Sequence, residues 1–201
     1  MIMLSFVGVL ALISVTKATL PFKFSDCSAP TANKLGYADH ISLSNDPIPI
    51  PGNETVSLDV HILREITGNY TVNLRVQRHL LFGYVEVPCV SDVGSCSYKL
   101  CDLLSGSHYQ SAHHCPVQVA TSSPDFNCAC PFVPGDYHLN PTAFEIHPLS
   151  ALLKWLAQGD YKAEARIIDD SNNEEVGCYY VEGSTIPTGC TGVSCVFGRR
   201  K

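Results

Sequence analysis

Apolar residues recur with a period of two along most of this chain. Three segments alternate apolar with polar side chains: 56–62, 70–76 and 161–167. This alternation predicts strands with one face against an apolar interior. Shorter stretches give four further candidate strands: 40–44, 84–87, 143–146 and 176–181. Polar and proline-containing turns separate them, so the pattern predicts an all-β, antiparallel chain.

Two segments depart from this period. The leucines between residues 149 and 156 fall at i, i+3, i+4 and i+7, which predicts a short helix over 149–159 with Ser150 at its start and Gly159 at its end. A single helical turn is predicted near 100–104. The longer helix would carry Trp155, the only tryptophan of the chain. Its pattern alone does not decide whether Trp155 faces a core or the outside.

Residues 2–15 are mainly apolar and stand at the start of the chain. The run is shorter than the about 20 residues of a membrane-spanning helix. Thr16 and Ala18 place small side chains at the positions that a signal peptidase requires for a cut before Thr19. We therefore expect a signal peptide over 1–18 and a soluble mature chain with a single domain over 19–201. A buried N-terminal helix is the alternative.

The ten cysteines all follow this segment. An even number of cysteines in a secreted chain predicts five disulfides, whose pairing the count leaves open. The spacings do not match those of a zinc site. Two N-glycosylation sequons, at Asn53 and Asn69, agree with a secretory route.

The chain is acidic, with 13 basic and 19 acidic residues. This balance excludes the basic surface of a nucleic-acid-binding protein. Its 8 histidines would bring the net charge close to zero near about pH 5. Repulsion from an anionic membrane would then weaken in an acidic compartment.

Catalytic motifs are scarce. The sequence lacks G-x-S-x-G, H-E-x-x-H and a phosphate-binding glycine loop. His113-His114 is the best local cluster, but it lies in a predicted loop without the calcium-binding glycines of a disulfide-rich phospholipase. The acidic stretch 169–175 does not have EF-hand spacing and is better explained as a polar hairpin turn. We expect no catalytic residue, metal or cofactor.

Apolar side chains also occupy a predicted loop at 80–84, between two strands. Loops usually run over the surface and are polar. An apolar loop, together with the apolar segment at 149–159, therefore indicates either an exposed binding patch or two segments folded inward. The pattern leaves these two possibilities equal.

Several longer stretches stand out: "DCSA" at 26–29, "DPIPIPGNET" at 46–55, "VEVPCVSDVGSC" at 85–96, "CACPFVPGDYHL" at 128–139 and "WLAQGDY" at 155–161. Between Cys27 and Cys178 the chain resembles the ganglioside-activator family of the ML (lipid-recognition) superfamily. This resemblance implies a β-cup, in which two antiparallel sheets of an immunoglobulin-like sandwich enclose a large apolar lipid cavity beside a disulfide-stapled loop region. The implied core covers about 27–181, with an extension at 182–201.

The resemblance also implies a disulfide pairing. The implied pairs are Cys27–Cys178, Cys89–Cys96, Cys101–Cys130 and Cys115–Cys128. Cys190 and Cys195 then remain to close a small fifth loop, ahead of a basic end at 199–201.

The function that the resemblance implies is not enzymatic. Such a protein lifts a glycosphingolipid from a membrane surface, holds its ceramide in the cup and presents the sugar to a β-hexosaminidase-type lysosomal glycosidase. Two apolar segments at the mouth of the cup would contact lipid. Their residues are Leu80, Leu81, Phe82, Tyr84, Leu152, Leu153, Trp155 and Leu156.

Tyr84 stands where the family has a tryptophan, so membrane insertion of this segment would be weaker. Two other functions stay open on the sequence. One is a secreted phospholipase-like hydrolase that uses His113-His114. The other is an extracellular lipid-sensing or defence protein on the same fold. The sequence is compatible with a lysosomal or an extracellular location.

Overall fold

The computed structural model describes residues 19–30, 32–104, 115–124, 128, 130–151 and 153–188. Several predictions fall outside these ranges and are not addressed by the structure. They concern the signal peptide, His113-His114, Leu152, the Cys190–Cys195 pair and the basic end.

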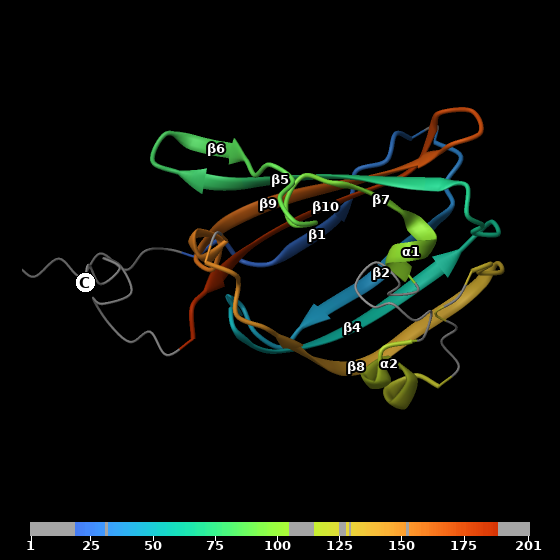
Figure 1. Ribbon diagram of the computed structural model, residues 1–201. Helices are drawn as coiled ribbons and strands as arrows, with labels where there is room; N and C mark the ends of the chain where they lie inside the picture. The colour runs from blue at the N-terminus through green and yellow to red at the C-terminus, as the bar shows by residue number, and fades with distance from the viewer. Residues whose placement is uncertain are drawn as a thin grey trace, which may run out of the picture.

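Two β-sheets lie one above the other (Figure 1). The larger sheet has the order β1-β10-β9-β5-β6, with β3 beside β10 and β7 beside β5, and the smaller has the order β2-β4-β8. All pairings are antiparallel except that of β3 with β10. The predicted all-β, antiparallel two-sheet fold is confirmed.

The strands of the larger sheet are β1 (Lys23–Asp26), β3 (Ile48–Pro49), β5 (Tyr70–Leu80), β6 (Gly83–Glu86), β7 (Ser97–Lys99), β9 (Gly159–Asp169) and β10 (Glu174–Ile186). Those of the smaller sheet are β2 (Gly36–Leu43), β4 (Gly52–Ile62) and β8 (Gly135–Ile146). Each of the seven predicted strands lies on an observed one. β8 is much longer than predicted, because Asn140-Pro141 interrupts its alternation. A proline is tolerated there since β8 is an edge strand of its sheet.

The helical elements of the described residues are short: α1 (Leu100–Leu104), α2 (Val117–Ser122) and the 3₁₀ turn η1 (Lys154–Leu156). The turn predicted at 100–104 is confirmed. The helix predicted over 149–159 is wrong, since η1 is the only helical part of the described residues 149–151 and 153–159, and Gly159 already belongs to β9. The Tyr161 hydroxyl donates a hydrogen bond to the Leu156 carbonyl, with an O···O distance of 2.7 Å. This carbonyl therefore has a hydrogen-bond donor without a further helical turn. No helix of the described part is long and apolar enough to cross a membrane.

Buried apolar residues form two separate clusters. The base cluster includes Leu35, Ile62, Val72 and Phe132. The lip cluster consists of Val87, Leu153 and Leu156, with Val76 and Tyr161 among the residues packed against it. The α1 helix, which contributes Leu100 to the base cluster, lies between the sheets toward the end opposite the β5–β6 hairpin (Figure 1).

The eight cysteines that the structure describes form four disulfides, which are the four pairs that the family resemblance implies: Cys27–Cys178, Cys89–Cys96, Cys101–Cys130 and Cys115–Cys128. The first joins residues 151 positions apart and attaches the segment after β1 to β10. The third attaches α1 to the segment before β8. These bonds hold the ends and the irregular region onto the sandwich.

Candidate functional site

An apolar cavity of about 390 Å³ lies between the two sheets. Its walls come from β2, β4 and β8 on one side and from β1, β5, β9 and β10 on the other, and α1 adds three leucines. The strand residues of the walls are Phe24, Gly36, Ala38, Ile41, Leu58, Val60, Ile62, Val72, Tyr137, Ala165, Ile167 and Tyr179. The volume lies near the lower end of the range of ligand pockets, about 300–1,000 Å³. Its capacity for a whole lipid stays a prediction.

The cavity lining contains no charged residue among the described residues, and its two tyrosine hydroxyls are satisfied. Tyr137 donates to the Val133 carbonyl at 2.8 Å, and Tyr179 donates to the Gly36 carbonyl at 3.0 Å. Burial, with Asp26 adding a smaller effect, raises the pKa of Tyr179 to about 12, so its hydroxyl remains a donor. A space with such walls accepts hydrocarbon and disfavours charge.

The β5–β6 hairpin carries large apolar side chains at its tip. Leu81 is 94% exposed and Phe82 is 102% exposed. Leu80 ends β5, and Tyr84 in β6 is only partly exposed. The predicted loop at 80–84 is therefore a tight hairpin whose tip contacts no core.

The η1 turn divides its side chains between inside and outside. Leu153 and Leu156 are buried in the lip cluster, whereas Trp155 is 47% exposed. A 3₁₀ turn has three residues per turn, so residues three apart point the same way. This geometry buries the two leucines together and leaves Trp155 between them facing outward.

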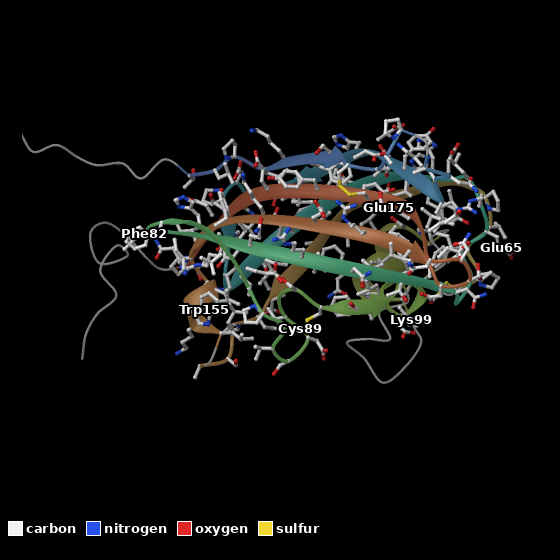
Figure 2. All side chains as sticks on the ribbon, turned by 90° about the horizontal axis from the view of Figure 1, so that it is seen from above. Glu65, Phe82, Cys89, Lys99, Trp155 and Glu175 are labelled. Carbon is white, nitrogen blue, oxygen red and sulfur yellow. A yellow bond between two sulfur atoms is a disulfide. The ribbon has the colours of Figure 1, made fainter. Side chains whose placement is uncertain are left out.

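The hairpin tip and the turn lie at the same end of the molecule, while Glu65 marks the opposite end (Figure 2). One cation–π contact links the hairpin to the turn, and a second links the hairpin to β9. The Arg78 guanidinium carbon of β5 lies 5.4 Å from the centre of the Trp155 ring, and Lys162 Nζ of β9 lies 4.3 Å from that of Tyr84. Such contacts stabilise by about 0.5–2 kcal/mol each. We call the joined apolar segments, 80–84 and 153–156, the lip.

The Arg78 side chain also binds the backbone just after the η1 turn. Its Nη2 donates to the Gln158 carbonyl at 2.7 Å. Gly159 permits this approach, because a Cβ there would lie 2.8 Å from Arg78 Nε. Tyr161 lies directly across from Arg78, and its pKa is raised by burial, an effect that the positive charge of Arg78 partly offsets.

The smaller sheet presents a row of ionisable side chains across three strands. His61 Nδ1 lies 2.5 Å from Asp136 Oδ1, and His61 Nε2 lies 2.8 Å from Asp39 Oδ2. The bond to Asp136, followed by that to Asp39, raises the pKa of His61, although desolvation opposes the shift. His138 and Asp59 form a second such pair. Alternation along the strands signals an exposed face here, but not which residues meet across it.

The remaining predicted residues occupy plain surface positions. Asn53 and Asn69 are both exposed, and their glycosylation stays a prediction. The acidic stretch forms the turn of the β9–β10 hairpin, as predicted. Two of its four carboxylates form ion pairs, Asp170 with Lys99 and Glu175 with Arg166.

Sequence reasoning missed the cavity lining and the two cations of the lip. The alternation of β5 contained a signal for Arg78, because this residue has the same parity as the apolar Val72, Leu74 and Val76. No comparable signal pointed to Lys162. Of the eight predicted lip residues, the structure describes all but Leu152 and places them at one end.

Comparison with known proteins gives three kinds of match. The ML domain family matches residues 21–184. Ganglioside GM2 activator from Mus musculus is 32% identical over 145 residues, which are 72% of this chain and 72% of that protein. The ganglioside GM2 activator from Macaca fascicularis is 30% identical over 145 residues, 72% of this chain and 73% of that protein. A solved Niemann-Pick type C2 protein from Japanese carpenter ant is 14% identical, with a TM-score of 0.41 over 81% of this chain and 98% of that one.

Proposed function

The chain belongs to the ML-domain family, and we propose that it is a non-enzymatic lipid-transfer protein that takes a glycosphingolipid from a membrane. Its acyl chains would enter the apolar cup, and its headgroup would stay outside for a β-hexosaminidase-type glycosidase. The observation that carries this proposal is the lip, with Leu81 and Phe82 fully exposed at one end of a sandwich with an apolar cavity.

A soluble lipid carrier must shield hydrocarbon from water, because each exposed methylene costs about 0.8 kcal/mol. The uncharged cavity lining can supply this shielding. The exposed apolar side chains of the lip would enter the membrane surface, where aromatic rings such as those of Trp155 and Tyr84 are favoured. Membrane contact and lipid storage therefore have separate structural bases in this chain.

The location that fits this function is the secretory pathway, with the lysosome or the extracellular space as its end. Four disulfides support an oxidising compartment. Similarity to ganglioside GM2 activators supports a lysosomal glycosidase as the partner.

A transfer experiment tests this function. The purified chain is incubated at about pH 5 with phosphatidylcholine vesicles that contain a ganglioside, then separated from them and analysed for bound lipid by mass spectrometry. We expect ganglioside to be carried off with the protein. The variant with Leu81→Ser and Phe82→Ser should bind vesicles at least about tenfold less well, since each buried side chain contributes about 1.5–3 kcal/mol.

The double variant should keep the unfolding temperature of the parent, because surface side chains contribute little to stability. The proposal fails if the parent chain carries no lipid. Carriage without any stimulation of a β-hexosaminidase would remove the activator role and favour a lipid-sensing protein. Calcium-dependent fatty-acid release that His113→Ala abolishes would favour a hydrolase.

A further inference from the structure

Arg78 occupies an unusual position on β5. Side chains alternate between the two faces of a strand, so Arg78 shares its face with Val72, Leu74 and Val76. Val72 lines the cavity, and Val76 packs against the lip cluster. Arg78 is thus the first charged residue on this face of β5 between the cavity and the lip, and it is only partly exposed.

The charge of Arg78 has no carboxylate partner among the described residues. Arg75 pairs with Glu86, and Arg166 pairs with Glu164 and Glu175, but no ion pair involves Arg78. Its Nε is buried and has no hydrogen-bond acceptor in the described structure. Its partners, the Gln158 carbonyl, the Tyr161 side chain and the Trp155 ring, are neutral, so an anion that reached the guanidinium would add a charge-assisted hydrogen bond.

The other charged groups near the lip do not supply that anion. Asp160 precedes Tyr161, the partner of Arg78, and so lies on the opposite face of β9. There it accepts a hydrogen bond from the Ser184 hydroxyl at 2.7 Å. Glu182 pairs with Lys23, and Lys154 and Lys162 add further positive charge. Glu182 is therefore ion-paired and Asp160 lies on the other face, whereas Arg78 contacts the Gln158 carbonyl and the Trp155 ring but no carboxylate among the described residues.

The spacing along β5 suits a lipid. Strand residues advance about 3.3 Å each, so Val72 and Arg78 are about 20 Å apart along the inner face. An acyl chain occupies half of the bilayer core of about 30 Å, hence about 15 Å. A chain whose end reaches the cavity at Val72 would place the polar junction of its lipid close to Arg78. Leu153 and Leu156 pack with Val76 in the lip cluster between these two positions.

We propose that Arg78 is a specificity-determining residue that binds the anionic group of a lipid headgroup, a sulfate, phosphate or carboxylate, at the mouth of the cup. Guanidinium groups suit such oxyanions, because their planar N–H donors can bind two oxygens at once. The Trp155 ring, which now covers the guanidinium, would move toward the membrane as the headgroup arrives. This inference rests on the proposed function and deepens it.

Galactosylceramide and its 3-sulfate form a matched pair of probes, since they share chains and sugar and differ by one anionic group. The full chain is incubated with phosphatidylcholine vesicles that contain both lipids with the same acyl chain, and the carried lipids are compared by mass spectrometry. We expect a preference for the sulfated lipid of about tenfold, as is typical of a hydrogen-bonded charge. Arg78→Gln should abolish the preference, and Arg78→Lys should keep part of it.

Arg75→Gln is the matched control, because Arg75 lies on the opposite face of the same strand and should leave the preference unchanged. Since Arg78 also supports the turn, Trp155 fluorescence in Arg78→Gln checks whether the turn has moved. Arg78→Lys is the second variant, because it keeps the positive charge beside the turn. Equal carriage of the two lipids by the parent, or a preference that survives Arg78→Gln, overturns this inference alone. If neither lipid is carried, the proposed function fails first.

A free anion is the other source of the same chemistry. Sodium phosphate, added without lipid and compared with sodium chloride at equal ionic strength, should leave Trp155 fluorescence unchanged, because the ring still covers Arg78. A phosphate-dependent change that Arg78→Gln removes, in a chain without lipid preference, would show a site for a soluble anion and overturn the assignment to a lipid headgroup.

Discussion

Trp155 and Leu156 are neighbours in one turn but have opposite surroundings. Leu156 is 7% exposed and packs with Leu153 and Val87, whereas Trp155 lies half-exposed against Arg78. Their contributions should therefore separate. Leu156 stabilises the fold, and Trp155 belongs to the surface that meets the membrane.

Trp155→Ala and Leu156→Ala test this separation at the residue scale. Trp155→Ala should lower the free energy of unfolding by about 1 kcal/mol, the contribution of an exposed cation–π contact, and should slow lipid carriage severalfold. Leu156→Ala should lower the free energy of unfolding by about 2–5 kcal/mol, because it opens a cavity in the lip cluster. Urea unfolding and the vesicle assay measure the two effects. A loss of 3 kcal/mol or more for Trp155→Ala would mean that this ring is core.

At the scale of elements, His61 ties the three strands of the smaller sheet together. Its two ring nitrogens contact Asp136 of β8 and Asp39 of β2, while His61 itself stands in β4. Tyr37 stacks on the ring at 4.7 Å, and His138 Nδ1 lies 2.8 Å from Asp59 Oδ1 on the neighbouring strands. Because two carboxylates raise the pKa of His61, the charged imidazolium is the form that this arrangement favours.

The sign of the pH dependence follows from the raised pKa. His61 contributes its full stabilisation below its unfolded value of about 6.5, and this contribution is lost as the pH rises through the higher folded value. His61→Gln should therefore lower the unfolding temperature near about pH 5 and have little effect well above neutrality. Calorimetry at both pH values measures the difference. His147→Gln, at an exposed histidine beside Glu145, is the control, and an equal loss at both pH values would contradict the assignment.

At the scale of the whole molecule, Cys27–Cys178 is the bond that closes the longest loop, across 151 residues. Cys89–Cys96 closes a loop across only 7 residues. A sandwich that keeps a cavity between its sheets has fewer packing contacts than a filled core, and restricting the unfolded chain compensates for them.

Replacing each pair with alanine separates the two bonds. In the chain-entropy model, loss of Cys27–Cys178 should lower the free energy of unfolding by about 5 kcal/mol, and loss of Cys89–Cys96 by about 2 kcal/mol. Urea unfolding of the two double variants measures both. Equal losses would show that loop length does not set the stabilisation here.

Much of this architecture could be predicted locally. Alternation along β4, β5 and β9 arises because one face of each strand is buried and the other is exposed. This difference is visible directly in the order of apolar and polar residues. The resemblance to the ganglioside-activator family predicted the disulfide pairs. Alternation failed at β8, where Asn140-Pro141 breaks the pattern in an edge strand, and helical spacing failed at 149–159, where positions three apart suit a 3₁₀ turn equally well.

The sequence by itself determined the strands, the apolar character of the lip segments and, with the family resemblance, the disulfide frame. Only the tertiary structure decided that Leu81, Phe82 and Trp155 face outward while Leu153 and Leu156 do not. It alone brought Arg78 of β5 to Trp155 and placed Lys162 on Tyr84. The physical reason is that burial and charge pairing depend on neighbours supplied by distant parts of the chain, and a local pattern holds no information about which neighbours those are.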